Sequence, residues 1–463
     1  MSLVLRGATV VDPLTGNKTT GRDVLVEGDR ISAIADKGSL QADQVVDATG
    51  KFLLPGFLDM HAHPTELKDP SGALALMLSY GITGFRQMSG NDALLADGKL
   101  PADSPALLAR PGDLLTPLNA GTPQKATAAV RHQHEKGADF IKAALTTAPA
   151  FAAAQTEANR LGIPILGHLP ANADVPRISG AGMRSIEHLG GGTGLLACCS
   201  SLQPQVEAAT AKRPEIKIPG FLVPLVTPLF AKVILPRLVV NPTGILKDPD
   251  VEIYQLAVGS FDEDAAARVA AMLKANGTWQ VPTLIRTKTM MRASDSAFAT
   301  DPDLRYIDPK ALKLWQNAAA KHGARSAEQR ATLALTSAVL QRLVKIMDDA
   351  GVRMLTGSDA TGAGWVVPGA SLHHEFDELA AAGLSPLRIL QMATCDAAEF
   401  LGKPDLGAVE IGKSAELVLL GSDPTASVDG LHDIAGVLRA GRWYDTSALT
   451  TLRERVATAR SAA

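Results

Sequence analysis

The sequence predicts an α/β protein built on a (β/α)8 barrel, with a small β-sandwich formed from both ends of the chain. Two patterns lead to this prediction. Between about residues 56 and 404, short apolar segments alternate with segments of helical periodicity, as expected for parallel β-α units. Residues 1–55 and 405–445 instead alternate apolar and polar side chains between turns, which is typical of antiparallel strands. The two outer segments would pack as one sandwich, leaving 446–463 as a terminal helix.

The expected barrel strands are apolar segments that are short enough for buried parallel strands. They are residues 57–62, 82–87, 113–118, 139–145, 163–168, 184–188, 279–285 and 353–358. Helices are expected at 122–136, 149–161, 263–275, 326–350, 371–382 and 386–401. The alternative is an open doubly wound sheet, which would need a glycine-rich phosphate-binding turn after the first strand. The first strand reads "GFLDMHAHP", which is not such a turn.

The composition narrows the classes of partner. The chain has 463 residues, with 45 Lys and Arg against 48 Asp and Glu, so its formal net charge is −3. This charge argues against a nucleic acid or an anionic membrane surface as the main partner. The three cysteines, Cys198, Cys199 and Cys395, lack the spacing of a disulfide framework or of a paired C-x-x-C zinc site. The amino terminus has no signal-peptide pattern, so we expect a cytoplasmic protein.

An unusually apolar insertion is expected at about residues 195–250. Its stretch "PGFLVPLVTPLFAKVILPRLVV" (219–240) is long enough to cross a membrane, but four prolines, Lys232 and Arg237 interrupt it. We therefore expect no membrane span. Exposing this much apolar surface to water would be unfavourable. The segment is expected either to close over the barrel mouth as a lid or to contact another copy of the chain in a homo-oligomer.

Six polar residues fall in the expected strands or at their carboxyl ends. In "LDMHAHP" one residue separates two histidines, and alternate residues of a strand face the same side. The other four belong to strands four, five, six and eight, whose carboxyl ends meet at the active-site face of a barrel. The six are His61, His63, Lys142, His168, His188 and Asp359. Four imidazoles and a carboxylate at one mouth predict a site for divalent metal, most naturally zinc.

Lys142 is unexpected inside the apolar strand "GADFIKAALTT", because burying an unpaired ammonium is costly. Two divalent ions held by four neutral histidines and one carboxylate would lack both negative charge and a bridging ligand. A lysine that reacts with CO2 becomes a carbamate, which supplies both and removes the ammonium. The alternative is an ammonium that pairs with a buried acid or points at bound substrate.

Several motifs resemble the amidohydrolase superfamily over nearly the whole chain. They include "LLPGFLDMHAHP" at the barrel entry and "IGKSAELVLL" at the return to the sandwich. "GADFIKA", "GHLP", "MRSIEHL" and "TGSD" resemble its imidazolonepropionase-related and prolidase-like members. The resemblance implies one metal bound by His61, His63 and Asp359, a second bound by His168 and His188, and a carboxylated Lys142 bridging them. "GFRQMSG" departs from the pattern, since an acidic residue is usual after strand two.

The predicted function is hydrolysis of a carboxamide or peptide-like C–N bond by a metal-bridging hydroxide. Substrates would be N-acyl amino acids, dipeptides or aryl amides with an apolar group. Asp359 would accept the hydroxide proton and deliver it to the leaving nitrogen. Carbamates, ureas, lactones or phosphotriesters are alternative substrates for the same site. Asp359 argues against a non-catalytic metal-binding scaffold, and Lys142 argues against mononuclear deamination.

Three further residues are candidates for binding a small-molecule amide substrate. Arg286, after strand seven, could hold a carboxylate through its planar guanidinium. His373 lies at the start of the helix after strand eight, and Tyr254, beside the insertion, could stabilise an oxyanion.

Overall fold

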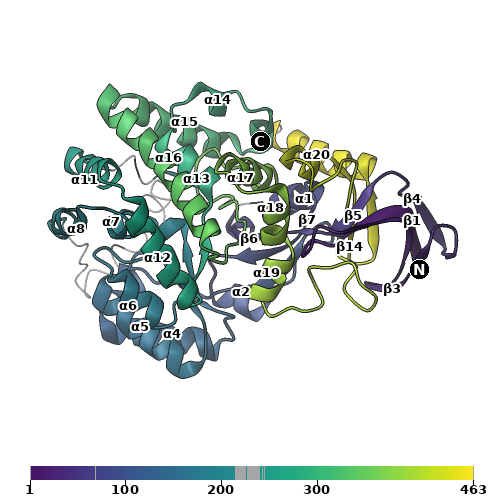
Figure 1. The fold of residues 1–463 in the computed structure, drawn as a ribbon, viewed down its shortest axis with the longest axis horizontal. Coiled ribbons are helices and arrows are strands. Elements are labelled where there is room, and N and C mark those ends of the chain that lie inside the picture. The colour runs from purple at the N-terminus through teal and green to yellow at the C-terminus, as the bar shows by residue number, and fades with distance from the viewer. Residues whose placement is uncertain are drawn as a thin grey trace.

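The computed structural model describes residues 2–67, 69–213, 226, 240, 241, 243 and 246–461. Strands from both ends of the chain lie together at one end of the molecule, and helices surround the parallel strands in the rest of it (Figure 1). Most of the apolar stretch 219–240 lies outside the described residues, so its role as a lid or a subunit contact stays a prediction.

Both ends of the chain contribute to one eight-stranded sheet, in the order β15-β14-β13-β5-β1-β2-β3, with β4 paired to β1. The strands are β1 (Ser2–Val11), β2 (Lys18–Glu27), β3 (Arg30–Asp36), β4 (Gln44–Asp47), β5 (Phe52–Pro55), β13 (Leu417–Leu420), β14 (Ile434–Arg439) and β15 (Arg442–Asp445). The two ends meet where β13 pairs antiparallel with β5, Leu417 opposite Pro55. The expected joining of the two ends is therefore observed, while their packing as a sandwich and the domain boundaries stay predictions.

Two parallel sheets form the centre of the rest of the chain. One holds β6 (Phe57–Ala62), β7 (Ile82–Gln87) and β8 (Ala106–Ala109), and the other holds β9 (Ile141–Ala143), β10 (Ile165–Gly167), β11 (Ser185–Glu187) and β12 (Trp279–Val281). Isolated parallel bridges extend both edges of the second sheet, from Ala143 of β9 to Leu115 and from Gln280 of β12 to Met354. A further bridge joins Ala62 to Ala360 and so returns to β6. This mixed α/β arrangement fits the expected barrel architecture.

Three expected strand ranges are wrong. The third strand lies at Ala106–Ala109, because Thr116 caps the short helix α3 (Pro117–Ala120) within the range 113–118. The seventh strand ends at Val281, since α13 (Leu284–Met291) begins three residues later. The range 353–358 contributes a bridge residue instead of a strand.

The expected helices match closely, because capping side chains mark where helices begin. Thr122 caps α4 (Pro123–Glu135), Thr147 caps α5 (Ala148–Leu161), and Ser326 forms a capping box with Gln329 at the start of α16 (Ala327–Asp349). The helix expected at 386–401 is divided into α18 (Pro386–Ala393) and α19 (Cys395–Phe400). Further helices are α1 (Pro70–Ser79), α2 (Asp92–Ala96), α11 (Asp248–Gly259), α12 (Glu263–Ala275), α17 (Ala370–Ala381) and α20 (Thr446–Ser461).

The main apolar core lies between the parallel strands and these helices. It includes Phe57, Phe151, Leu343 and Phe376, whose side chains are fully buried. Such large buried side chains hold the strand ends in fixed relative positions, because a close-packed interior resists displacement. Among the described helices, none has the length and apolar character to cross a membrane.

Candidate metal centre

His61, His63 and Asp359 lie together where β6 meets the turn that follows the bridge residue Met354. The backbone fixes this meeting, because the Asp359 amide donates to the His61 carbonyl at 2.7 Å and the His63 amide donates to the Ala360 carbonyl at 2.6 Å. His61 Nε2 lies 3.4 Å, and His63 Nε2 3.1 Å, from Asp359 Oδ1. The ligand atoms of the three residues all lie within 4.8 Å of one another. Two imidazoles and a carboxylate at this spacing fit a divalent ion such as zinc.

His168 and His188 bring two further imidazoles to this group, from the ends of β10 and β11. The His188 ring centroid lies 4.3 Å from that of His61 and 5.0 Å from that of His168. His188 Nε2 lies 3.8 Å from Asp359 Oδ2. All four predicted histidines and the carboxylate are therefore brought together at the ends of different strands.

In each of these four histidines, Nδ1 has a hydrogen-bond partner outside the group. The partners are Glu187 Oε2 for His61, Ser89 Oγ for His63, the Ala144 carbonyl for His168 and Thr283 Oγ1 for His188. Contacts of this kind fix the orientation and the tautomer of a metal-binding imidazole. For His61 and His168 the partner can only accept, so the proton lies on Nδ1 and the Nε2 lone pair is available to a metal.

Lys142 lies in β9 with only 2% of its surface exposed. Among the described residues, its Nζ has no hydrogen-bond partner. Burial lowers the pKa of Lys142 to about 8, although the charges of Glu187 and Asp359 favour the protonated form. Burial likewise holds the pKa values of His61, His168 and His188 well below the ordinary value. The site thus favours neutral nitrogen atoms, which are the form that binds metal.

Backbone strain concentrates at this site. His188, Thr283 and Asp359 have φ angles of 54°, 46° and 55°, in the left-handed region that residues other than glycine rarely adopt. Gly362 packs so closely beside Asp359 that a Cβ would lie 2.2 Å from its Oδ1. The fold therefore fixes the carboxylate tightly, at a cost that is common in functional sites.

Of the three candidates for substrate binding, Arg286 contacts the cluster directly. It lies in the first turn of α13, is 8% exposed, and pairs through Nε with Asp359 Oδ2. Tyr254 lies in α11 and packs against Met291 and Leu333. Burial raises the pKa of Tyr254, and the positive charge of Arg286 opposes this shift. The two side chains thus belong to neighbouring parts of the structure.

The structure does not support the expectation that His373 contacts substrate. Its Nε2 donates to the Tyr80 carbonyl at 2.7 Å, and its Nδ1 lies 2.9 Å from His432 Nδ1. Its ring packs edge-on against Phe57 and Phe376. Because Phe57 begins β6 and Tyr80 precedes β7, His373 lies at the amino ends of the strands, away from the metal ligands.

Three buried charged residues belong to the site although the sequence reasoning did not identify them. Asp59 accepts hydrogen bonds from the Ser358 amide at 3.1 Å and hydroxyl at 2.6 Å, which holds the residue before Asp359. Burial raises the pKa of Asp59 to about 6. The other two are Arg86 in β7 and Glu187 in β11. Their signal in the sequence is the one that marked Lys142, a charge inside an apolar strand.

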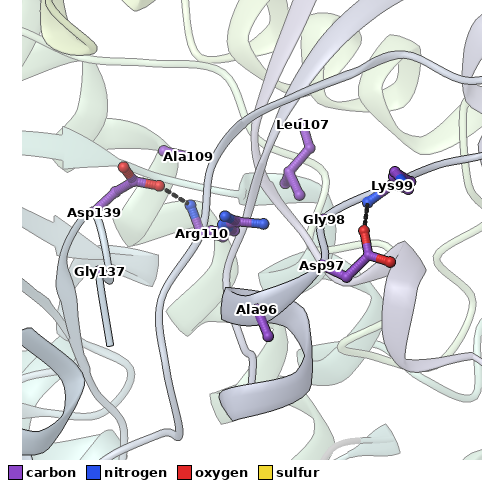
Figure 2. A pocket seen from close by; sticks show the side chains of 9 residues that line it. All are labelled: Ala96, Asp97, Gly98, Lys99, Leu107, Ala109, Arg110, Gly137 and Asp139. Carbon is purple, nitrogen blue, oxygen red and sulfur yellow. Dashed lines mark hydrogen bonds between the residues drawn. The ribbon is translucent and has the colours of Figure 1, made fainter. Parts of the chain in front are cut away.

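A surface hollow of about 440 Å³ lies elsewhere and contains none of these residues. Figure 2 shows its lining, which is Ala96, Asp97, Gly98, Lys99, Leu107, Ala109, Arg110, Gly137 and Asp139. The Arg110 amide donates to Asp139 at 2.8 Å. Asp139 precedes β9, whereas the histidines of the cluster lie at or just after the carboxyl ends of their strands, so the hollow is separate from the candidate metal centre.

Comparison with known protein families gives matches of limited length. The model of the amidohydrolase family matches residues 250–444. The N-acyl-D-glutamate deacylase of Alcaligenes xylosoxydans xylosoxydans is 36% identical over 114 residues, which are 24% of this chain and 23% of that protein. The adenine deaminase of Deinococcus deserti is 40% identical over 84 residues, 18% of this chain and 15% of that protein. The chain thus spans less than a quarter of the length of these curated relatives.

Solved structures match over nearly the whole chain. A bottromycin amidohydrolase has a TM-score of 0.69 at 24% identity, covering 99% of this chain and 90% of that chain. A Xaa-Pro dipeptidase with bound methionine has a TM-score of 0.61 at 17% identity, covering 96% and 100%. The ochratoxinase of A. niger has a TM-score of 0.59 at 13% identity, covering 96% and 95%. At these identities the likeness concerns the fold.

Proposed function

The chain belongs to the amidohydrolase superfamily, and we propose that it is a metal-dependent hydrolase that cleaves a carboxamide or a peptide-like C–N bond. The observation that carries the proposal is the group formed by His61, His63 and Asp359, with ligand atoms within 4.8 Å of one another. His168 and His188 adjoin this group and would bind a second ion. Similarity to a deacylase and a deaminase supports the cleavage of a C–N bond.

We propose further that the two parallel sheets close into an eight-stranded barrel. The bridges from Leu115 to Ala143 and from Gln280 to Met354 support this closure, since they extend both edges of the second sheet. Leu115 lies in the segment that follows β8, and the segment that follows Met354 bridges to β6 through Ala360 and Ala62. In a closed barrel the carboxyl ends of all the strands share one face. The convergence of ligands from β6, β10 and β11 agrees with this arrangement.

Lys142 would carry a carbamate between two divalent ions, with zinc the expected metal. In this reaction the neutral Nζ forms a bond to the carbon of CO2 and loses a proton to solvent, leaving a carboxylate anion. A lysine pKa of about 8 makes the neutral amine accessible near physiological pH. Lys142 Nζ has no hydrogen-bond partner among the described residues, which also supports the addition of a carboxylate group to this atom.

Divalent ions at this site would supply Lewis acidity, which activates water and polarises a carbonyl group near neutral pH. Asp359 would accept the proton of the attacking water and deliver it to the leaving nitrogen. Its Oδ1 has no hydrogen-bond partner among the described residues. Arg286 offers a planar guanidinium to a substrate carboxylate. Tyr254 would contribute an apolar wall with one donor, which suits an N-acyl amino acid or an aryl amide.

The test combines metal analysis with a substrate panel. We expect about two zinc ions per chain and hydrolysis of N-acyl amino acids or anilides in preference to phenylureas. Lys142→Ala should lose metal and activity together, and added short carboxylates should partly restore both. One ion per chain at full activity would overturn the binuclear centre. A Lys142→Ala variant with normal metal content and rate would overturn the carbamate.

A further inference from the structure

A fully buried ion pair lies directly behind His61. Arg86 in β7 and Glu187 in β11 are both 0% exposed, and Arg86 Nη2 donates to Glu187 Oε1 at 3.0 Å. Glu187 Oε2 lies 2.6 Å from His61 Nδ1. Ser185 donates its hydroxyl proton to Glu187 Oε1 at 2.6 Å. Both oxygens of this carboxylate are therefore engaged, one of them by a candidate metal ligand.

The hydrogen bonds define the tautomer of His61. A carboxylate only accepts and a guanidinium only donates, so the bond between Glu187 and His61 places the imidazole proton on Nδ1. The second nitrogen, Nε2, then carries the lone pair and lies 3.4 Å from Asp359 Oδ1. The carboxylate thus turns the ring so that its metal-binding atom points into the cluster.

Arg86 is itself held on several sides. Its Nε donates to the Met60 carbonyl at 2.7 Å, one residue before His61. Its guanidinium lies over the rings of Phe140 and Phe400, at 5.7 and 5.1 Å from their centroids. Arg86 therefore contacts both the backbone of the strand that carries His61 and the carboxylate that orients its ring.

Burying two charges in a core is unfavourable, and an apolar pair of similar volume would often be at least as stable. Stability alone therefore gives a weak reason for this pair. We propose that Arg86 and Glu187 are positioning residues for the metal centre, Glu187 by orienting His61 and Arg86 by holding Glu187 in place and balancing its charge. This inference rests on the proposed function, because it presupposes that His61 binds metal.

The experiment measures zinc affinity by competition with a chromophoric chelator, together with thermal melting of the metal-free protein. We expect Glu187→Gln and Arg86→Met each to weaken zinc binding roughly 10–100-fold, the usual effect of losing an outer contact of a metal ligand. The double variant should lose little more than either single variant, because both changes break the same chain of contacts.

Two matched controls separate positioning from general destabilisation. Arg184 also lies over the Phe400 ring, at 4.7 Å, and Arg184→Met removes a similar side chain, whose contacts among the described residues are with Phe400 and Trp279. Asp23 is a fully buried carboxylate of β2 that accepts from the Gly7 and Gly38 amides. Arg184→Met and Asp23→Asn should lower the melting temperature while leaving the zinc affinity within about threefold of wild type, the scatter expected between independent sites.

Ser185→Ala covers the case in which the charge variants do not fold. It removes one hydrogen bond from Glu187 and keeps the ion pair, and it should weaken zinc binding several-fold with little loss of melting temperature. Unchanged zinc affinity in Ser185→Ala and in every folded variant of Arg86 or Glu187 would overturn the inference while leaving the proposed function intact. A wild-type protein that does not compete for zinc would instead overturn the proposed metal centre, and this inference with it.

Discussion

The molecule contains two groups of histidines with a carboxylate, and they differ in what their ring nitrogens contact. At the metal centre each ring uses Nδ1 for one outward hydrogen bond. In the second group, His373 contacts the Tyr80 carbonyl and His432, and His432 Nε2 contacts Asp377 Oδ1 at 2.8 Å. Both ring nitrogens of both histidines therefore have partners in the second group.

This difference separates a ligand set from a structural cluster. The Tyr80 carbonyl can only accept, so His373 carries its proton on Nε2 and its Nδ1 accepts from His432. Burial lowers the pKa of His373 to about 3, which keeps its ring neutral. Among the described residues, the grouping of three ligand atoms within 4.8 Å is found at His61, His63 and Asp359. Nitrogen and oxygen atoms that converge, more than the number of histidines, therefore distinguish the candidate metal centre.

The largest expected effect is the loss of hydrolysis rate when the carboxylate of Asp359 is replaced by an amide. Asp359→Asn keeps an oxygen ligand but removes the base, so the rate of amide hydrolysis should fall roughly 10²–10⁴-fold while most of the metal remains. Asp377→Asn is the matched control, and its rate should stay within about twofold of wild type because Asp377 contacts His432 in the structural cluster, away from the predicted metal ligands. Steady-state kinetics with elemental analysis measures both. Equal rate losses for an anilide and an activated ester would show that Asp359 is only a ligand.

A second prediction concerns the free energy of unfolding of the metal-free protein in CO2-free buffer. The pKa of Lys142 is about 8 in the folded state and 10.5 ordinarily, so between these pH values the unfolded chain binds more protons than the folded one. Stability should therefore rise with pH across this window, by roughly 3 kcal/mol relative to Lys142→Met, at about 1.4 kcal/mol per pKa unit. Urea unfolding from pH 7.5 to 10.5 measures this difference. The exposed Lys125, changed to Met, should show no such trend, and parallel curves for wild type and Lys142→Met would contradict the prediction.

The smallest expected effect concerns the second group. His373 has a folded-state pKa of about 3 against an ordinary 6.5, so the unfolded chain takes up a proton first as the pH falls below 6.5. The stability of wild type over His373→Gln should therefore shrink by roughly 2 kcal/mol between pH 6.5 and 5. Zinc content should be unchanged in this variant. His134→Gln, at an exposed position of α4, is the control, and a constant difference between wild type and His373→Gln across this range would reject the assignment of a neutral ring.

The sequence by itself determined features that depend on neighbouring residues. The pattern "HAH" places two imidazoles on one side of β6 because a strand alternates its side chains. Capping residues such as Thr122 and Ser326 set the starts of α4 and α16 to within one residue of the expectation. The order of ligands along the alternating strands was sufficient to predict the set His61, His63, His168, His188 and Asp359, which the structure brings together.

The tertiary structure decided which of these side chains keep a free lone pair. Glu187 lies 126 residues from His61 and 101 residues from Arg86 along the chain. Arg286, in α13, is likewise distant from Asp359 in sequence, and the tertiary fold brings the two side chains into contact. Conversely, the sequence made His373 a candidate for substrate binding, whereas its contacts with Tyr80 and His432 place it away from the predicted metal ligands. Sequence periodicity specifies the face that a side chain occupies, whereas its hydrogen-bond partners come from distant segments. Those partners fix tautomer, charge and orientation, and thus decide which histidines can bind metal.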